Sequence, residues 1–351
     1  MQVRQNVPLA PLTTLKVGGP ARFFSRAEST EQAIEAIDWA NAQSLPLFVL
    51  GGGSNVVIAD SGWPGLVLQI AVPGIQQIDH GEKAVFEVGA GVEWDSFVEH
   101  AVALNFGGIE CMSGIPGTVG GTPIQNVGAY GQDVSQTIRQ VEVLDLQSKS
   151  VRALTNEACK FSYRSSIFNH AERGAFIVLK VSYTLEPGGP PHIEYADLKK
   201  FFQGNAAPSL AQTREAVRQI RRSKAMLIVD GDPDARSVGS FFKNPMVSHQ
   251  QLQDISANPA AAGAKVPSFA GESGEIKISA AWLVEHAGFQ RGYTRGRVGI
   301  SSKHALAIVN RGGATAAEIF ALHREIQERV GEVFGIKLAP EPVFVGFEQV
   351  S

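Results

Sequence analysis

Hydrophobic positions recur with the period of a helix in several segments of the chain. The segment at residues 29–43 begins with Ser29 three residues before Gln32, which is the spacing of a helix-capping box, and its isoleucines at 34 and 37 fall on one face. Three further helices are predicted at residues 94–104, at residues 209–224, and from residue 316 toward a stop at Gly335.

Short apolar runs between these helices predict strands. "LPLFVL" at 45–50 and "VVIAD" at 56–60 flank a run of glycines, so that the glycines join strand to strand. A dinucleotide fold of the Rossmann type needs glycines that open a helix with a G-x-G-x-x-G spacing, and this loop offers neither. Further strands are predicted as a hairpin that turns at 147–150, a half-buried alternating strand at 175–185, and a last strand at 342–347. The chain is therefore predicted to be α+β.

The composition is that of an ordinary globular chain. With 351 residues, 44% of them hydrophobic, the chain can bury cores for two or three domains, and the break "EPGGPP" is followed by a predicted boundary near residue 205. A formal net charge of −3 gives no reason to expect binding to nucleic acid or to a membrane surface. Cys111 and Cys159 lie far apart, and the histidines show no ligand spacing, so neither a disulfide framework nor a metal site is expected. The N-terminus lacks an apolar export segment, so we expect a cytoplasmic protein.

The 37 glycines exceed the usual share of about 7% of residues and concentrate in two stretches. These are "LGGGSN" at 50–55 and "SGIPGTVGGTPIQNVGAYG" at 113–131. Glycines let a ligand approach main-chain N–H groups closely, which is how loops bind phosphates without a cationic side chain. Either stretch alone is equally compatible with a tight turn. Together, with hydroxyl and amide side chains between the glycines, they favour a nucleotide cofactor.

Six motifs of the chain resemble, in the same order, those of one known protein family. "TTLKVGGPARFF", "LGGGSNVVIAD", "SGIPGTVGGTPIQNVGAYGQ", "CKFSYRSSIF", "GSFFKNP" and "APEPVFVG" follow one another in the order and approximate spacing of the UDP-N-acetylenolpyruvoylglucosamine reductase family. The resemblance runs from about Thr13 to Gly346, and "HIEYADLKKF" resembles the tyrosine-bearing loop of the longer, type I form. It implies an α+β fold: a two-subdomain FAD-binding unit of the vanillyl-alcohol oxidase/PCMH type over residues 1–70 and 71–205, and a C-terminal α+β substrate-binding domain over 206–351.

The resemblance also implies the reaction. In this family NADPH reduces a non-covalently bound FAD and leaves, and the enolpyruvyl ether of UDP-N-acetylglucosamine then accepts hydride at its methylene carbon to give UDP-N-acetylmuramate, a peptidoglycan precursor. Negative charge develops on the adjacent carbon and spreads into the carboxylate, so the protein must stabilise this charge and deliver one proton. We expect a monomer that binds this UDP-sugar and has no nucleic acid or membrane partner.

Three residues match the family's catalytic positions. Arg164 would stabilise the substrate carboxylate, because a guanidinium is a permanently charged fork. Glu341 would act beside it, and Ser240 would donate the proton to the carbanion. Seen alone, Arg164 and Glu341 are typical of surface loops, and the stretch around Ser240 is typical of a turn followed by a buried strand.

The resemblance places FAD at the two glycine stretches. The implied cofactor-binding residues are Gly51, Gly52, Gly53, Ser54, Asn55, Gly114, Ile115, Pro116, Gly117, Thr118, Gly120, Gly121, Gln125, Asn126, Gly128 and Ala129. The implied substrate-binding residues are Tyr195, Lys224 and Asn244. The chain departs from the family pattern before Ser240, where "AMLIVDGDPDARSV" at 225–238 is longer than the usual segment, so the conformation of this insertion and the reach of Lys224 stay open.

Two alternatives stay open from the sequence. One is an FAD oxidase of the same fold that acts on another substrate. The other is a flavin- or nucleotide-binding regulator without catalysis, which the joint presence of Arg164, Ser240 and Glu341 disfavours.

Overall fold

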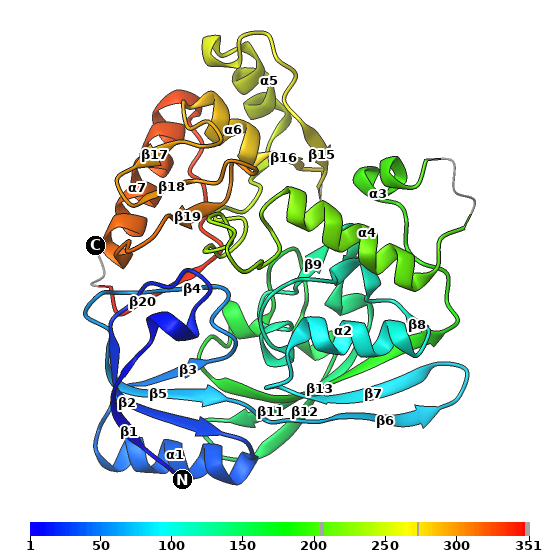
Figure 1. Ribbon diagram of the computed structural model, residues 1–351, viewed down its shortest axis with the longest axis vertical. Coiled ribbons are helices and arrows are strands. Elements are labelled where there is room, and N and C mark those ends of the chain that lie inside the picture. The colour runs from blue at the N-terminus through cyan, green and yellow to red at the C-terminus, as the bar shows by residue number, and fades with distance from the viewer. Residues whose placement is uncertain (204–206, 272–273, 348–351) are drawn as a thin grey trace. The chain divides into compact units, whose positions relative to one another are not determined.

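The computed structural model describes residues 1–203, 207–271 and 274–347 (Figure 1). The chain forms two compact units. The first unit comprises Met1–Val7, Ala21–Ser54 and Trp63–Arg222, and the second comprises Pro8–Pro20, Asn55–Gly62 and Ser223–Ser351. Two short N-terminal segments therefore fold with the C-terminal part of the chain. The domain boundaries drawn from the sequence at residues 70 and 205 stay predictions.

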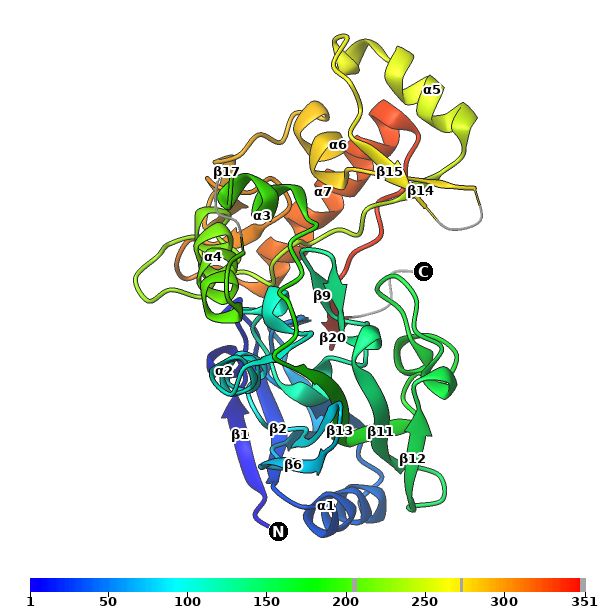
Figure 2. The ribbon, with the colours of Figure 1, turned by 90° about the vertical axis from the view of Figure 1, so that its right-hand side faces the viewer.

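The smaller sheet of the first unit has the strand order β1-β2-β5-β3. Its strands are β1 (Arg4–Pro8), β2 (Pro20–Ala27), β3 (Leu47–Leu50) and β5 (Trp63–Ile70), and β5 pairs in parallel with both β2 and β3. Helix α1 (Thr30–Ala42) packs against β5, and Figures 1 and 2 show this helix close to the N-terminus. The predicted cap is present, because the Ser29 side chain accepts from the N–H of Gln32, while the Gln32 side chain accepts from the N–H of Glu28.

The larger sheet of the first unit is antiparallel, with the order β12-β11-β13-β7-β6 and with β8 paired to β13. Its strands are β6 (Ile75–His80), β7 (Ala84–Gly89), β8 (Phe106–Gly107), β11 (Ile138–Asp145), β12 (Val151–Thr155) and β13 (Phe176–Pro187). The predicted hairpin and long strand are both confirmed. The expected half-burial of the long strand is wrong, because β13 lies in the middle of the sheet and Val178 and Ser182 are buried as well as Ile177 and Leu179.

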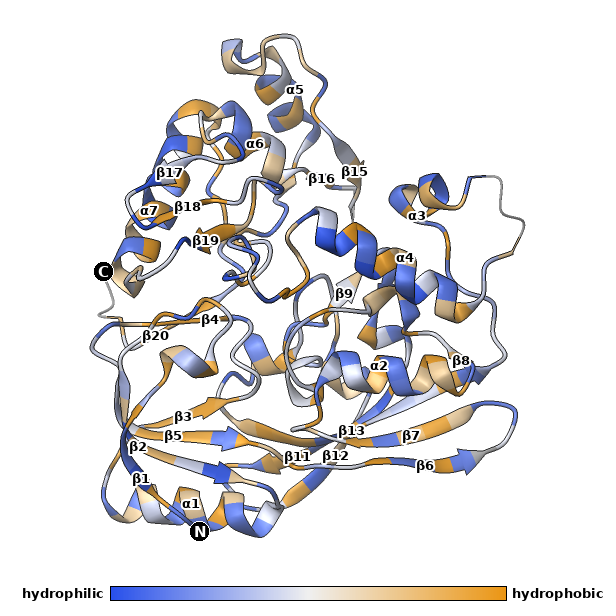
Figure 3. Ribbon diagram, viewed as in Figure 1, coloured by the Kyte–Doolittle hydropathy of each residue, from blue (hydrophilic) through white to orange (hydrophobic). Residues whose placement is uncertain are grey.

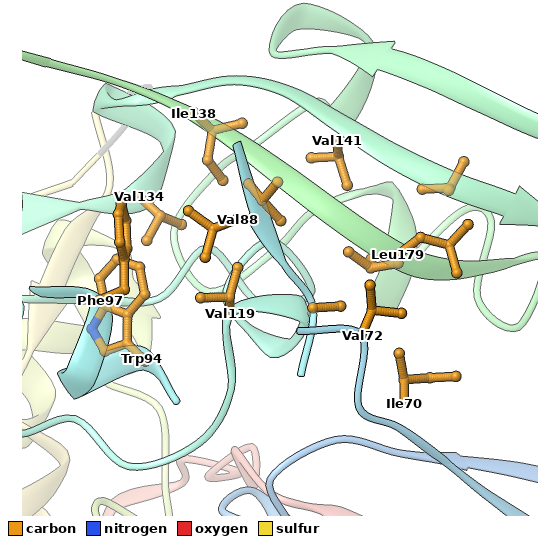
Figure 4. Packing of buried hydrophobic residues seen from close by; sticks show 14 of the residues in the cluster. Ile70, Val72, Val88, Trp94, Phe97, Val119, Val134, Ile138, Val141 and Leu179 are labelled. Atoms are coloured by element: carbon orange, nitrogen blue, oxygen red, sulfur yellow. The ribbon is translucent and has the colours of Figure 1, made fainter. Parts of the chain in front are cut away.

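The core of the first unit joins this sheet to helix α2 (Trp94–Ala103). Figure 4 shows Trp94 and Phe97 of α2 near Val88 of β7 and near Val119 and Val134, which lie outside the strands. The indole N–H of Trp94 donates to the carbonyl oxygen of Met112 at 3.0 Å, so the buried ring also ties α2 to the glycine-rich stretch that follows. The unit is completed by the hairpin β9 (Gly128–Ala129) and β10 (Gln132–Asp133), and by helices α3 (Ala196–Phe201) and α4 (Leu210–Ser223).

The second unit is built from short strands around one hydrophobic cluster. One sheet has the order β14-β16-β15, another the order β17-β18-β19, and β4 pairs in parallel with β20. The strands are β4 (Val56–Ile58), β14 (Met246–Val247), β15 (Ser268–Ala270), β16 (Ile276–Ile278), β17 (Thr294–Arg295), β18 (Val298–Ile300), β19 (Ile308–Asn310) and β20 (Val343–Val345).

Helices α5 (His249–Ala257), α6 (Ala280–His286) and α7 (Ala316–Phe334) cover these strands. Helix α7 begins with a capping box between Thr315 and Glu318 and ends at Gly335, whose φ of 69° is left-handed, as the sequence predicted. Its apolar stripe is buried, and Figure 3 shows orange and blue residues alternating around α7. None of the helices in residues 1–203, 207–271 and 274–347 has the length and apolar character needed to cross a membrane.

Candidate active site

The two glycine-rich stretches of the first unit approach each other closely. A Cβ on Gly52 would lie 2.7 Å from the Cα of Gly117 and 3.0 Å from the backbone nitrogen of Thr118. Gly117 has a φ of +119°, and a Cβ there would lie 2.6 Å from the hydroxyl oxygen of Ser54. We call residues 51–54 the first glycine loop and residues 114–121 the second glycine loop. A side chain at Gly52 would therefore meet the backbone of the second glycine loop, and one at Gly117 would meet the Ser54 side chain, so both positions need glycine.

A buried hydroxyl lies at this contact. The Oγ1 of Thr118 is inaccessible to solvent and has no hydrogen-bond partner within the described part of the chain, and it would lie 3.1 Å from a Cβ on Gly51. A buried polar atom without a partner is costly, so it points to a ligand with polar oxygens. The residues present therefore fit a phosphate-bearing cofactor such as FAD, held by backbone N–H groups and a hydroxyl.

Arg164 lies against the segment that follows the second glycine loop. Its guanidinium donates to the carbonyl oxygens of Gly128 at 2.9 Å and of Asn126 at 3.4 Å. Both Asn126 and Arg164 have left-handed backbones, with φ of 45° and 54°. The Asn126 side chain is engaged within the protein, since it donates to the Ser162 carbonyl and accepts from the Ser135 N–H. The structure thus brings Arg164 to the expected FAD-binding residues Asn126 and Gly128.

Ser240 and Glu341 lie on adjoining segments of the second unit. The N–H of Glu341 donates to the carbonyl oxygen of Phe241 at 2.9 Å, and Phe242 forms a β-bridge with Pro340. The side chain of Asn55 donates to the carbonyl oxygen of Glu341 at 3.2 Å. Both Ser240 and Glu341 are half-buried. The segment that follows Ser240 is therefore paired through its main chain with the segment that carries Glu341, although Ser240 and Glu341 are 101 positions apart in the sequence.

The two phenylalanines after Ser240 pack in the core. Both are buried, and the ring of His323 on α7 stacks on Phe242 with centroids 5.9 Å apart. Burial lowers the pKa of His323 to about 4, which leaves a neutral imidazole in this aromatic cluster. The close packing of the Phe241 and Phe242 rings fixes the backbone that carries Ser240.

The insertion at 225–238 is fastened by two aspartates. Asp234 is buried, and its Oδ2 accepts from the hydroxyl of Ser301 at 2.9 Å and from the N–H and hydroxyl of Ser302 at 2.9 and 2.7 Å. Asp232 pairs with Lys303 at 2.6 Å, and this hydrogen bond is the main reason that the pKa of Asp232 is lowered. The conformation that the sequence left open is thus set by residues 301–303.

The substrate-binding candidates divide between the units. Tyr195 is exposed at the N-terminus of α3 in the first unit, where its ring meets the edge of Tyr130 at a centroid distance of 5.4 Å. Lys224 and Asn244 belong to the second unit, and the Oδ1 of Asn244 accepts from the N–H of Ala280 at the start of α6. The Asn244 oxygen therefore has a structural task at the start of α6.

Two carboxylates near the glycine loops were missed from the sequence. Asp95 accepts from the N–H of Gly114, and the fully buried Glu110 accepts from the N–H of His192 at 2.8 Å, three residues before Tyr195. Asp95 reads as an ordinary first-turn acid on a helix, and Glu110 as one acid among glycines. A helical or strand periodicity could have predicted that Glu110 is buried, but the glycine-rich stretch around it has no such periodicity.

Known proteins with a similar sequence define the class. The sequence model of the FAD binding domain matches residues 21–153, which include both glycine loops. With the α+β fold and the fit of the loops to a phosphate-bearing cofactor, the chain is a flavoprotein oxidoreductase that binds FAD. The model of the UDP-N-acetylenolpyruvoylglucosamine reductase C-terminal domain matches residues 232–345, which include Ser240 and Glu341.

The relatives place the chain in one family. The UDP-N-acetylenolpyruvoylglucosamine reductase of Thermobifida fusca is 45% identical over 97% of this chain and 98% of its own, and that of Saccharopolyspora erythraea is 42% identical over 96% and 94%. The crystal structure of the Thermus caldophilus enzyme superimposes with a TM-score of 0.67 at 25% identity and covers 98% of this chain and 99% of its own. The chain belongs to the UDP-N-acetylenolpyruvoylglucosamine reductase family, a group of flavin-dependent reductases of peptidoglycan precursor synthesis, and the expected α+β fold with FAD-binding and C-terminal parts is confirmed.

Proposed function

We propose that this protein uses NADPH to reduce the enolpyruvyl ether of UDP-N-acetylglucosamine to UDP-N-acetylmuramate, as a cytoplasmic monomer. The observation that carries the proposal is the hydrogen bond from the Glu341 N–H to the Phe241 carbonyl, because it holds the backbone of Glu341 next to the residue that follows the candidate proton donor, Ser240. The same chain holds two converging glycine loops suited to FAD. A reductase of this substrate needs both arrangements.

The glycine loops would hold the cofactor mainly through their backbones. Residues 51–54 and 114–121 can approach a pyrophosphate, and Thr118 supplies a buried hydroxyl without a protein partner in the described residues. Gln125, Gly128 and Ala129 continue this surface, whereas Asn126 contributes through its backbone because its amide is engaged. Asn55 lies next to the loop in sequence and supports Glu341. When bound, FAD supplies the hydride chemistry.

Arg164, Glu341 and Ser240 would serve the carbon adjacent to the one that accepts the hydride, where negative charge develops. Arg164 is held by the carbonyls of Asn126 and Gly128, and its permanent charge suits a carboxylate that gains negative charge in the transition state. Glu341 would act with it at the substrate carboxylate. Ser240 would give its hydroxyl proton to the strongly basic carbanion, a step that an unactivated alcohol can perform only against such a base.

Three further residues would bind the UDP-sugar. Tyr195 is exposed and buttressed by Tyr130, so it can cover a ligand without losing its own packing. Asn244 can donate from its amide nitrogen, since its oxygen caps α6. Lys224 would meet the diphosphate as a cation, and its charge already contributes to the lowered pKa of His304, which burial brings to about 4.

A spectroscopic titration of the purified protein tests the proposal. Under anaerobic conditions NADPH should bleach the flavin absorbance, and the enolpyruvyl UDP-sugar should restore it with formation of UDP-N-acetylmuramate. Bleaching without reoxidation by the UDP-sugar, accompanied by rapid oxygen consumption in air, would instead identify an oxidase. A protein that binds flavin but is not reduced by NADPH would be a regulator, and the proposal would be wrong.

A further inference from the structure

Asp95 lies at the meeting point of three segments of the first unit. It is the second residue of α2, and its Oδ1 accepts from the N–H of Gly114, the first residue of the second glycine loop, at 2.6 Å. Two arginines on α4 hold the same carboxylate. Arg214 bonds both oxygens, at 2.5 and 3.1 Å, and Arg218 bonds Oδ2.

The ion pair between Asp95 and Arg214 is largely buried. Only 10% of the Arg214 side chain and 28% of the Asp95 side chain are exposed. Burial by itself raises the pKa of Asp95, but hydrogen bonds from Arg214 and Gly114 and the charges of the two arginines outweigh it, so the pKa is lowered. The carboxylate is therefore ionised at neutral pH. A bidentate arginine in this setting fixes the carboxylate in direction as well as in place.

The start of α2 holds the second glycine loop at several points. Besides the bond from Gly114 to Asp95, the N–H of Trp94 donates to the carbonyl oxygen of Gly117 at 3.0 Å, and Glu93 forms a β-bridge with Thr118. Of these contacts, only the one at Gly114 uses a side chain. The position of Gly114 therefore depends on where the Asp95 carboxylate is held, and that is decided by α4, whose polar residues appear blue in Figure 3.

We propose that Asp95, oriented by Arg214 and Arg218, is a positioning residue for FAD: it sets the second glycine loop at the distance from the first that the cofactor requires. The inference rests on the proposed role of the two loops in binding FAD. Arg214 and Arg218 of α4 then hold the second glycine loop in place through Asp95. Gly117 and Thr118, three and four residues after Gly114, approach the first loop at Gly52 and Ser54, so a displacement of Gly114 alters this close contact.

The test compares two neighbouring acids on α2 that face the same arginine. In Asp95→Asn the amide can offer its one oxygen either to Gly114 or to Arg214, and its NH₂ group then faces another donor. In the control, Glu99→Gln, the acid lies 3.7 Å from Arg214 with 70% of its side chain exposed, and it has no contact with the loop in the described residues. The measurement is the dissociation constant of FAD for the full-length protein after flavin removal, read from quenching of flavin fluorescence, together with the thermal midpoint of the flavin-free protein.

We expect Asp95→Asn to weaken FAD binding by about tenfold or more, in line with the loss of a charged hydrogen bond, and Glu99→Gln to change it by less than about twofold. Arg214→Lys keeps the charge but loses the bidentate hydrogen bond, so it should weaken FAD binding by several-fold. This variant provides the test if Asp95→Asn does not fold. An unchanged FAD constant in the folded Asp95→Asn and Arg214→Lys proteins overturns the inference, whatever happens to the thermal midpoint.

Gly52→Ala separates this inference from the proposed role of the loops. Its added Cβ would meet the backbone of Gly117, so FAD binding should weaken strongly if the loops hold the cofactor. If Gly52→Ala weakens FAD binding and Asp95→Asn does not, the glycine loops bind FAD as proposed but the role proposed for Asp95 is wrong. If Gly52→Ala binds FAD normally, the assignment of the loops itself fails.

Discussion

The main-chain N–H of Glu341 donates a 2.9 Å hydrogen bond to the carbonyl oxygen of Phe241, the residue after Ser240. The bond belongs to a short ladder, because the N–H of Lys243 also donates to the carbonyl oxygen of Ala339 at 2.9 Å. Phe241 is fully buried, so the ladder is anchored in the core of the second unit. The alcohol and the carboxyl group proposed for catalysis are thus placed by backbone and packing, and substitutions of their side chains should leave the fold intact.

Ser240→Ala should slow one half-reaction and spare the other. Without the hydroxyl, reoxidation of the reduced enzyme by the enolpyruvyl UDP-sugar should be slower by about 10²-fold or more, the range expected for a lost proton transfer. Reduction of the flavin by NADPH should be nearly unchanged, because no proton from Ser240 is needed there. Stopped-flow absorbance measures both steps on the same protein. Equal slowing of the two would exclude Ser240 as the proton donor.

Arg164→Met should impair the same half-reaction for an electrostatic reason. The loss of the positive charge should slow substrate reduction by on the order of 10²-fold, as for other groups that stabilise developing negative charge. Arg164→Lys retains the charge but cannot bond the carbonyls of Asn126 and Gly128 together, so its rate should lie between those of Arg164→Met and the parent protein. Single-turnover reoxidation at saturating substrate is the measurement. A parent-like rate for Arg164→Met would show that the guanidinium is structural only.

Asp234→Asn should destabilise the second unit. The buried Oδ2 accepts from three donors on Ser301 and Ser302, and an amide there would leave a donor facing other donors. We expect a loss of about 1–3 kcal/mol in the free energy of unfolding, measured by urea titration. Asp230→Asn, the same change at an exposed position of the insertion, is the control and should have almost no effect. Equal stability of the two variants would mean that the insertion is not fastened through Asp234.

His323→Phe should reduce the amount by which the free energy of unfolding falls at acid pH. The folded pKa of His323 is lowered from the ordinary 6.5 to about 4 by burial, so the unfolded chain binds the proton more readily between these values. The neutral ring contributes its full stability above pH 6.5, and this contribution falls as the pH drops from 6.5 to about 4, by about 3 kcal/mol for one such group.

Urea titrations at pH 7 and pH 4.5 measure this effect as a difference between two proteins. His304, whose pKa burial also lowers to about 4, is present in both, so its contribution cancels in the comparison. The parent protein should lose more stability between the two pH values than His323→Phe does. The same loss in both proteins would contradict a neutral His323 in the fold.

Much of the local structure could be predicted because its causes are local. Ser29 caps α1 and Gly335 ends α7 where the sequence placed them, and the first glycine loop joins two strands as expected. The catalytic candidates came from motifs in register with a family, and the structure shows that two of them, Ser240 and Glu341, share one ladder. Their chemical roles stay predictions until the half-reactions are measured.

The long-range contacts could not be predicted in the same way. Asp95 meets Arg214 across 119 residues, Glu110 meets His192 across 82, and Asp234 meets Ser301 across 67. Each acid has an ordinary local setting, and nothing in its neighbours reveals which distant donor it will accept from. The same holds for residues 55–62, which fold with the C-terminal part because β4 pairs with β20.

The sequence by itself determined the α+β class, the principal helices and the family, since these follow from short-range periodicity, caps, glycine conformations and contiguous motifs. The tertiary structure alone decided that Asp95 binds the second glycine loop at Gly114, that Asp234 holds the insertion, and that the backbone of Glu341 pairs with Phe241, the residue after Ser240. The physical reason is that a buried polar group must find a partner wherever the packed chain brings one, and that choice is made by the whole fold and not by neighbours in sequence.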